Sequence, residues 1–180
     1  MIDTKALRSR ILDLAIQGKL TQQLESDGTA EELYQQIQAE KQKLLKEGKI
    51  RKGKPLPEIT ADEIPFEIPN NWKWLQCADL CANIPNAFAD GPFGSNLKTD
   101  HYTQEKQVRI IQLGNIGEDG WRDKNEKYTT FEHLKTIERS EVKAGNIVIA
   151  KMMPAGRAII VPDISVKYVL SSDFIKFVPH

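Results

Sequence analysis

Three polar side chains follow a glycine-bracketed Pro-Phe pair between residues 91 and 98. The stretch reads Gly-Pro-Phe-Gly-Ser-Asn-Leu-Lys. Glycine permits positive φ and close backbone approach, whereas proline fixes φ and removes a hydrogen-bond donor. These residue types predict a tight loop in which Phe93 is a buried plug and Ser95, Asn96 and Lys98 point outward. Such a loop suits an anionic or hydrogen-bonding partner, and a plain surface turn is the alternative interpretation.

Further polar side chains stand at the ends of predicted loops and strands in the second half of the chain. Arginine and lysine pair with guanine edges, asparagine and glutamine pair with adenine, and serine and lysine also bind phosphates. Each residue alone is typical of an ordinary protein surface, but together they suit a face that reads the base edges of DNA. The candidate DNA-binding residues are Gly94, Ser95, Asn96, Lys98, Gln112, Asn115, Lys151, Arg157, Ser171 and Ser172.

A metal-dependent nuclease site is the main catalytic alternative. Glu141-Val142-Lys143, with Asp119 or Asp123 upstream, resembles the end of such a site, although the pattern is short and common. The chain has no G-x-x-x-x-G-K-[ST] phosphate loop, no G-x-G-x-x-G and no G-x-S-x-G motif. Its two cysteines and three histidines show no spacing typical of metal ligands, so we expect no bound metal.

The 25 basic and 25 acidic residues of this 180-residue chain give no net charge. This balance excludes a strongly basic domain, but a protein can still gather charge on one face or share DNA binding with a partner. Residues 41–54 hold seven basic residues against one acidic residue, and residues 55–71 hold four acidic residues and no basic one. No apolar run is long enough to span a bilayer and no secretory leader is visible, so we expect a cytoplasmic protein without membrane association.

The first part of the chain is predicted to be helical. Residues 4–17 have apolar side chains at helical spacing with Gly18 as a stop, and a second helix begins after a capping box formed by Thr29 and Glu32. The apolar stripe of the second helix is narrow. This pattern predicts either packing along another helix, as in an antiparallel coiled coil, or a solvated helix against its own domain. Proline-rich residues 49–71 are predicted to be a linker with one helical turn at residues 60–63.

The second part is predicted to be an α+β domain with a mixed, mainly antiparallel, curved sheet. A short helix is predicted to end at Leu80, and a turn is predicted at residues 118–120. Strands are predicted at residues 108–113, 146–151, 157–161 and 173–178, and a helix at 131–138. The predicted organisation is a helical segment at residues 1–48, a linker at 49–71 and a β-rich domain at 72–180.

Several blocks of the sequence resemble the specificity (S) subunit of type I restriction–modification systems. They are residues 7–20 (LRSRILDLAIQGKL), residues 68–72 (IPNNW), residues 91–98, residues 108–116 (VRIIQLGNI) and residues 144–151 (AGNIVIAK). In the last block the family more often has an aspartate where this chain has Asn146. The blocks lie in the family's order and together span nearly the whole chain.

The resemblance implies a non-catalytic subunit that binds double-stranded DNA. In that family a helical region spaces two target-recognition domains, each of which reads one half of a split DNA site. The subunit recruits methyltransferase subunits, which carry S-adenosylmethionine, and restriction/translocase subunits, which use ATP and Mg²⁺. This chain itself is therefore expected to bind no cofactor.

The length of the chain leaves its assembly open. One target-recognition domain is present between Trp72 and His180, which implies either a fragment of a two-domain subunit or a half-length subunit that dimerises through its helices. An assembly module is a further alternative, in which the helices dock a partner and the second domain does not contact DNA.

Overall fold

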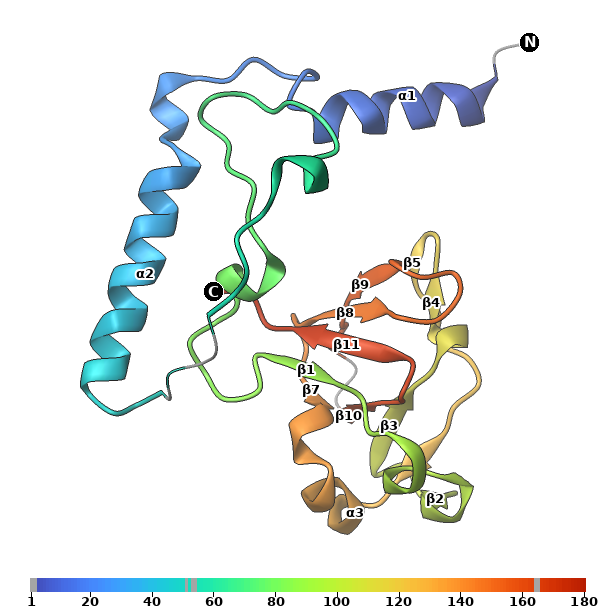
Figure 1. Ribbon diagram of the computed structural model, residues 1–180. Helices are drawn as coiled ribbons and strands as arrows, with labels where there is room; N and C mark the ends of the chain where they lie inside the picture. The colour runs from blue at the N-terminus through green and yellow to red at the C-terminus, as the bar shows by residue number, and fades with distance from the viewer. Residues whose placement is uncertain (1–2, 51, 53–54, 164–165) are drawn as a thin grey trace. The chain divides into compact units, whose positions relative to one another are not determined.

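The chain forms two compact units, Met1–Asp79 and Leu80–His180. The computed structural model describes residues 3–50, 52, 55–163 and 166–180 (Figure 1). The predicted domain boundary at Trp72 lies before the division between the units, because the residues around Trp72 are bound to the helical part of the chain. No helix in these described ranges is long and apolar enough to cross a membrane.

The first unit begins with helix α1, Thr4–Ile16, which confirms the helix predicted at residues 4–17. Asp3 caps it, because its Oδ1 accepts hydrogen bonds of 3.0 Å from two amides of the first turn. Gly18 follows the helix with a φ of 66°, the left-handed conformation of a helix C-terminus. The amide of Lys19 then donates to the carbonyl of Leu14 over 2.8 Å, so α1 ends at the glycine that the sequence pattern indicates.

Helix α2, Ala30–Lys46, begins at the predicted capping box. Thr29 Oγ1 accepts a hydrogen bond of 3.2 Å from the amide of Glu32, and Glu32 Oε2 accepts one of 3.0 Å from the amide of Thr29. Ile37 is buried, while Leu33 is exposed. Since Ile37 is the one buried residue of α2, all of which the structure describes, this helix contributes little to a core of its own.

The chain after α2 returns to the start of that helix. The carbonyl of Asn71 accepts a hydrogen bond of 2.9 Å from the amide of Ala30. The indole Nε1 of Trp72 donates to Gln23 Oε1 over 2.8 Å. Short 3₁₀ helices occupy Glu25–Asp27, Ala61–Glu63 and Cys77–Leu80, which confirms the turn predicted at residues 60–63 and the short helix that ends at Leu80.

The second unit contains two small sheets and a β-hairpin, so the single curved sheet predicted from the sequence is replaced by a layered arrangement. The antiparallel four-stranded sheet has the order β1 (Phe88–Asp90), β11 (Phe174–Phe177), β8 (Ile147–Ala150) and β9 (Ala158–Ile160). The five-stranded sheet has the order β2 (Tyr102–Thr103), β6 (Tyr128–Thr129), β3 (Val108–Ile111), β10 (Lys167–Leu170) and β7 (Glu141–Val142). Only β3 and β10 run parallel among the described strand pairs. The α+β class and the mainly antiparallel pairing are thus confirmed.

The remaining elements of this unit are short. The hairpin consists of β4 (Ile116–Gly117) and β5 (Gly120–Trp121), and its two-residue connection lies within the turn predicted at residues 118–120. Helix α3, Phe131–Thr136, confirms the helix predicted at residues 131–138. Single 3₁₀ turns occupy Gly94–Asn96, Thr99–His101, Leu113–Asn115 and Glu138–Ser140.

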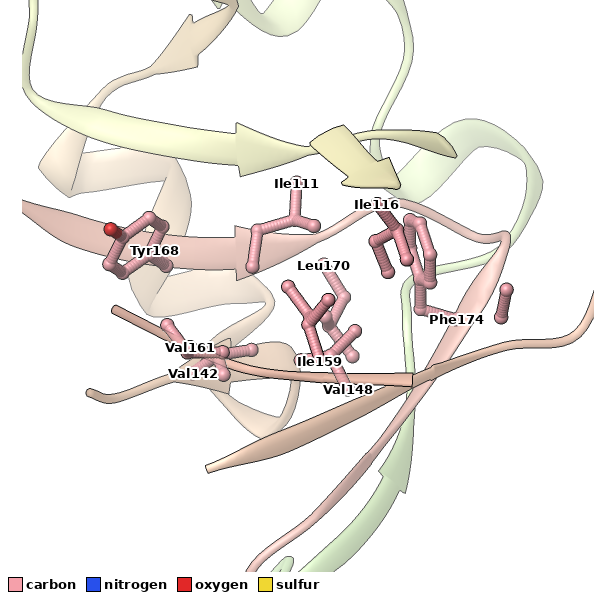
Figure 2. Close-up of a cluster of buried hydrophobic side chains, with 10 residues drawn as sticks. Ile111, Ile116, Val142, Val148, Ile159, Val161, Tyr168, Leu170 and Phe174 are labelled. Atoms are coloured by element: carbon pink, nitrogen blue, oxygen red, sulfur yellow. The ribbon is translucent and has the colours of Figure 1, made fainter. Parts of the chain in front are cut away.

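The main core lies between the two sheets. Ile111 and Leu170 of the five-stranded sheet pack against Val148 and Phe174 of the four-stranded sheet, as Figure 2 shows. A second cluster on the other face of the five-stranded sheet joins Val108, Ile110 and Val169 to Leu134 of α3 and to Ile137. Strands β3 and β10 are consequently buried on both faces, and they form the rigid centre from which the loops extend.

Candidate nucleic-acid interface

Several strands of the second unit end together at one end of the two sheets. The last residues of the parallel strands β3 and β10, Ile111 and Leu170, are paired. The chain then passes through residues 171–173 to β11, whose first residue Phe174 pairs with Ala150, the last residue of β8. The ends of β1 and β8 lie beside the start of β11 (Figure 1). We call this end, formed by residues 91–96, 112–115, 151–157 and 171–173, the loop end.

Two glycines shape the first loop for different reasons. A Cβ on Gly91 would overlap the carbonyl oxygen of Ser171, and the Gly91 amide donates to the carbonyl of Phe174 over 2.9 Å. Only glycine therefore fits where the loop crosses the start of β11. Gly94 has open space around it but a φ of 55°, which side chains other than glycine adopt at a cost.

Phe93 is not the buried plug that the sequence predicts. Its side chain is 61% exposed, whereas Gly91 and Pro92 are buried and anchor the loop. The backbone packing of Gly91 against residue 171 leaves the aromatic ring outside. The ring centroid lies 4.4 Å from the Nζ of Lys151, a cation–π contact at the surface of the loop end.

Lys151 is held by several contacts at the loop end. Its Nζ forms an ion pair of 2.7 Å with Asp90 Oδ1, and its amide donates to the carbonyl of Asp173 over 2.8 Å. Asp173 Oδ2 also accepts a hydrogen bond of 3.1 Å from Ser171 Oγ. Lys151 is half-buried between the carboxylate and the Phe93 ring, so its ammonium group is held in one place at the surface. Ser172 beside this group is exposed.

Arg157 connects the β8–β9 hairpin to the β4–β5 hairpin. Its guanidinium forms an ion pair of 3.0 Å with Glu118 in the turn between β4 and β5. Strand β5 lies against β9, which begins directly after Arg157 (Figure 1). The structure therefore brings Lys151 and Arg157 to opposite sides of one hairpin, β8–β9, at the edge where the loops meet.

Asn115 has a different role from the one predicted. The residue is completely buried, and its Oδ1 accepts a hydrogen bond of 2.9 Å from the amide of Gln112. Its Nδ2 donates to the carbonyls of Arg122 and Lys124 over 3.1 and 2.6 Å. This burial leaves Asn115 no surface for a direct base contact, and we revise its role to holding the backbone of the neighbouring loop. Gln112 itself is half-buried at the end of β3.

The residues after Gly94 extend from the loop end toward α3. Ser95, Asn96 and Lys98 are all exposed, and Lys98 forms an ion pair of 2.9 Å with Asp100. The Asn96 carbonyl lies 2.8 Å from Nε2 of His133, whose ring stacks on that of His101 with centroids 4.0 Å apart. Burial lowers the pKa of His101, and the neighbouring His133 and Lys98 lower it further because a second positive charge is unfavourable there.

Two groups of exposed residues lie outside the predicted set, one within the loop end and one beyond it. Met153, in the β8–β9 connection, is 85% exposed. Arg122, Lys124 and Lys127 are exposed on the segment that follows β5. The run of charged and amide residues between the predicted turn at 118–120 and the predicted helix at 131–138, Arg-Asp-Lys-Asn-Glu-Lys, is the signal that indicates the second group.

The carboxylates of the proposed nuclease pattern have separate ion-pair partners. Asp119 pairs with Arg122 at 3.1 Å, and Glu141 pairs with Lys167 at 3.2 Å. Asp123 pairs instead with the buried Arg109. Across the described part of the chain, no group of three or more His, Cys, Asp or Glu side chains is placed to hold a metal ion. The structure gives no support to this alternative.

Curated proteins similar to this chain include two from Escherichia coli. The type I restriction enzyme EcoAI specificity subunit is 36% identical over 160 residues, which cover 83% of this chain and 23% of that protein. The EcoEI specificity subunit is 30% identical over 175 residues, which cover 96% of this chain and 28% of that protein. This chain is related to the type I specificity subunits. The resemblance seen in the sequence is confirmed, and the chain spans about a quarter of the length of these relatives.

No protein-family model matches the chain. Among solved structures, a chain from work on the complex assembly and conformational transition of the type I restriction–modification system aligns with a TM-score of 0.46 and 12% identity. The alignment covers 98% of this chain and 35% of that one.

Proposed function

We propose that this chain is a sequence-specific DNA-recognition part of a type I restriction–modification complex. The observation that carries the proposal is the 36% identity over 160 residues with the EcoAI specificity subunit. In this proposal the chain has no catalytic chemistry and binds no cofactor. Methyltransferase partners supply S-adenosylmethionine, and restriction/translocase partners use ATP and Mg²⁺ on double-stranded DNA in the cytoplasm.

The loop end supplies the DNA contacts in this proposal. Lys151 and Arg157 offer cations to phosphates or guanine edges, and the exposed Ser95 and Ser172 offer hydroxyl groups to phosphates. Strands buried on both faces fix the backbone from which these side chains project. Recognition residues on loops above a rigid scaffold are the usual arrangement in binding proteins.

The helices of the first unit supply the docking surface for the other subunits. Helix α1 exposes the apolar side chains Leu7, Ile11, Leu12 and Ile16. A run of exposed apolar residues on one helix is typical of a surface that a partner covers. We infer that this partner is a methyltransferase subunit, and that pairing with a second copy of the chain through the helices is the alternative.

Selection of DNA from a random pool tests the proposal directly. The full chain, assembled with its methyltransferase subunit, is incubated with randomised duplexes, and bound DNA is sequenced over several rounds. We expect enrichment of one sequence over the starting pool. Binding without any enriched sequence would refute the assignment.

Replacing Lys151 with methionine tests the loop end as the binding surface. We expect Lys151→Met to lower the affinity for the enriched sequence about tenfold, because it removes a cation held at the proposed interface. The fold should persist, since a partly exposed ion pair such as Lys151–Asp90 contributes at most about 1 kcal/mol to stability.

The matched control is Lys167→Met. Lys167 is an exposed lysine in a surface ion pair with Glu141, and it starts β10 at the end opposite the loop end. Equal affinities of the two variants for the enriched sequence, measured by fluorescence anisotropy, would place the DNA elsewhere on the domain.

A further inference from the structure

Arg109 is a buried cation in the middle of strand β3. The residue is 1% exposed, and its guanidinium lies between the rings of Trp121 and Tyr128, 5.8 and 5.7 Å from their centroids. Its ion-pair partners are Asp123 at 3.0 Å and Glu126 at 3.5 Å. Nη2 also donates to the carbonyl of Lys124 over 3.3 Å. All three polar partners of the guanidinium belong to one short segment, residues 123–126.

The same segment is held a second time by Asn115. Its buried amide group donates to the carbonyls of Arg122 and Lys124, and its own carbonyl accepts a hydrogen bond of 2.8 Å from the amide of Arg122. At the far end of the segment, the carbonyl of Lys127 accepts a hydrogen bond of 2.8 Å from the amide of Ile110. We call residues 122–127 the 122–127 loop. Its backbone is thus held by the buried side chains of Arg109 and Asn115 and by the Ile110 amide of β3.

The two acidic side chains of this loop pair with the buried guanidinium, and the other four side chains are exposed without such a pairing. Those exposed side chains are Arg122, Lys124, Asn125 and Lys127. Arginine and asparagine side chains can pair with guanine and adenine edges, and lysines suit phosphates. Arg122 is at present paired with Asp119 at 3.1 Å. Asn125 has a φ of 51°, a strained backbone conformation that its surroundings must maintain.

A role in packing alone does not account for Arg109. Taking a guanidinium out of water is costly, and an apolar side chain of similar volume fills such a site at no loss of stability in many proteins. The Arg109 Nε moreover lies buried without a hydrogen-bond partner. The guanidinium provides what an apolar side chain lacks, namely two ion pairs and a carbonyl contact that set the position of the loop.

We propose that the 122–127 loop is an additional DNA-contact site and that Arg109 is its positioning residue. The ligand is the same double-stranded DNA, so the proposal rests on the proposed function and extends it to a surface outside the loop end as defined above. Arg109 itself does not touch DNA. It acts by fixing the backbone that presents Lys124 and Asn125.

The contact role is tested with two surface variants in the assembled complex. Lys124→Met removes an exposed cation, and Asn125→Gly removes the amide while glycine keeps the positive φ. Each should lower the affinity for the enriched sequence about tenfold without a change in melting temperature. Lys135→Met, an exposed lysine on α3, is the matched control and should stay within about twofold of wild type. Loop variants that bind like the control would overturn the contact role.

The positioning role is tested with Arg109→Met and Asp123→Asn. Both should increase amide hydrogen exchange in residues 122–127 and lower the ratio of specific to random-sequence affinity about tenfold, with random-sequence affinity unchanged. Asp123 is exposed, so Asp123→Asn removes its ion pair with Arg109 without changing the core. This variant therefore keeps the test valid if Arg109→Met does not fold. An unchanged specificity ratio in Asp123→Asn overturns the role of Arg109. A wild-type complex that enriches no sequence would instead refute the proposed function itself.

Discussion

Gly91 and Gly94 lie three positions apart in one loop, yet they are required for different physical reasons. At Gly91 the neighbouring backbone leaves no room for a Cβ, and at Gly94 the φ angle disfavours one. The buried pair Gly91-Pro92 anchors the loop, which frees Phe93 to lie on Lys151. The sequence pattern predicts the turn and its glycines, but which residue is buried depends on the crossing with β11, a contact distant in sequence.

Alanine substitutions separate the two roles. Gly91→Ala should lower the free energy of unfolding by about 3 kcal/mol, because the added methyl group forces the backbone at Ser171 to move. Gly94→Ala should cost only about 1 kcal/mol, the usual penalty of a left-handed conformation. Urea denaturation of both variants measures the difference. Equal losses would mean that the loop does not cross β11 as described.

At the scale of elements, the strands that were predicted are those with a recognisable pattern or a marked end. Strand β3 has a run of four mostly apolar residues before Gly114, and β8 and β9 flank a Pro-Gly connection. Strand β10 was not predicted, although it is an interior strand between β3 and β7. It has four residues, and burial on both faces removes the alternation of polar and apolar side chains by which a strand is recognised. The two-residue strands are too short to show any period.

Tyr168 on β10 makes the stability of the folded protein depend on pH. Its ring is buried and its hydroxyl donates to the carbonyl of Pro162 over 3.1 Å. Burial raises the pKa of Tyr168 to about 12 from the ordinary value of 10.0. Between these values the unfolded chain loses the phenolic proton while the folded chain keeps it, so the free energy of unfolding should fall as pH rises from about 10 to about 12.

The comparison with Tyr168→Phe isolates this contribution. The variant loses one hydrogen bond, worth about 1 kcal/mol, but has no phenol to ionise. As pH rises above 10, the free energy of unfolding of the wild type should therefore fall relative to that of the variant. Urea denaturation of both proteins at several pH values measures this change. A difference that is constant with pH would show that Tyr168 ionises as readily in the folded protein as in the unfolded one.

At the scale of the whole molecule, the blocks that resemble specificity subunits include the structural centre and the first loop of the second unit. Residues 108–111 and 147–150 are the core strands β3 and β8, and residues 91–98 form the loop that crosses β11. The sequence therefore predicts the family and the main scaffold. It does not predict the 122–127 loop, because Arg109 and Asn115, whose side chains fix this loop, lie outside it in the chain.

The ion pairs of the candidate contact residues bear on how the DNA affinity of this chain, which has no net charge, depends on salt. Lys98, Arg122, Lys151 and Arg157 each have a carboxylate partner. We expect the logarithm of DNA affinity to depend only weakly on the logarithm of salt concentration for the isolated chain. Asp90→Asn, which frees Lys151, should make that slope steeper by about one, measured by anisotropy at several salt concentrations. An unchanged slope would contradict a role for Lys151 at a phosphate.

The paired carboxylates act as counterions that are built into the protein. A phosphate that approaches Lys151 must displace Asp90 rather than a mobile anion, so part of the entropy usually gained by ion release is absent. A duplex that does not fit the loops well enough to compensate for this exchange leaves the internal pairs intact. In the proposed interface, Asp90 and Glu118 compete with DNA for Lys151 and Arg157, so binding favours the DNA whose additional contacts compensate for the exchange.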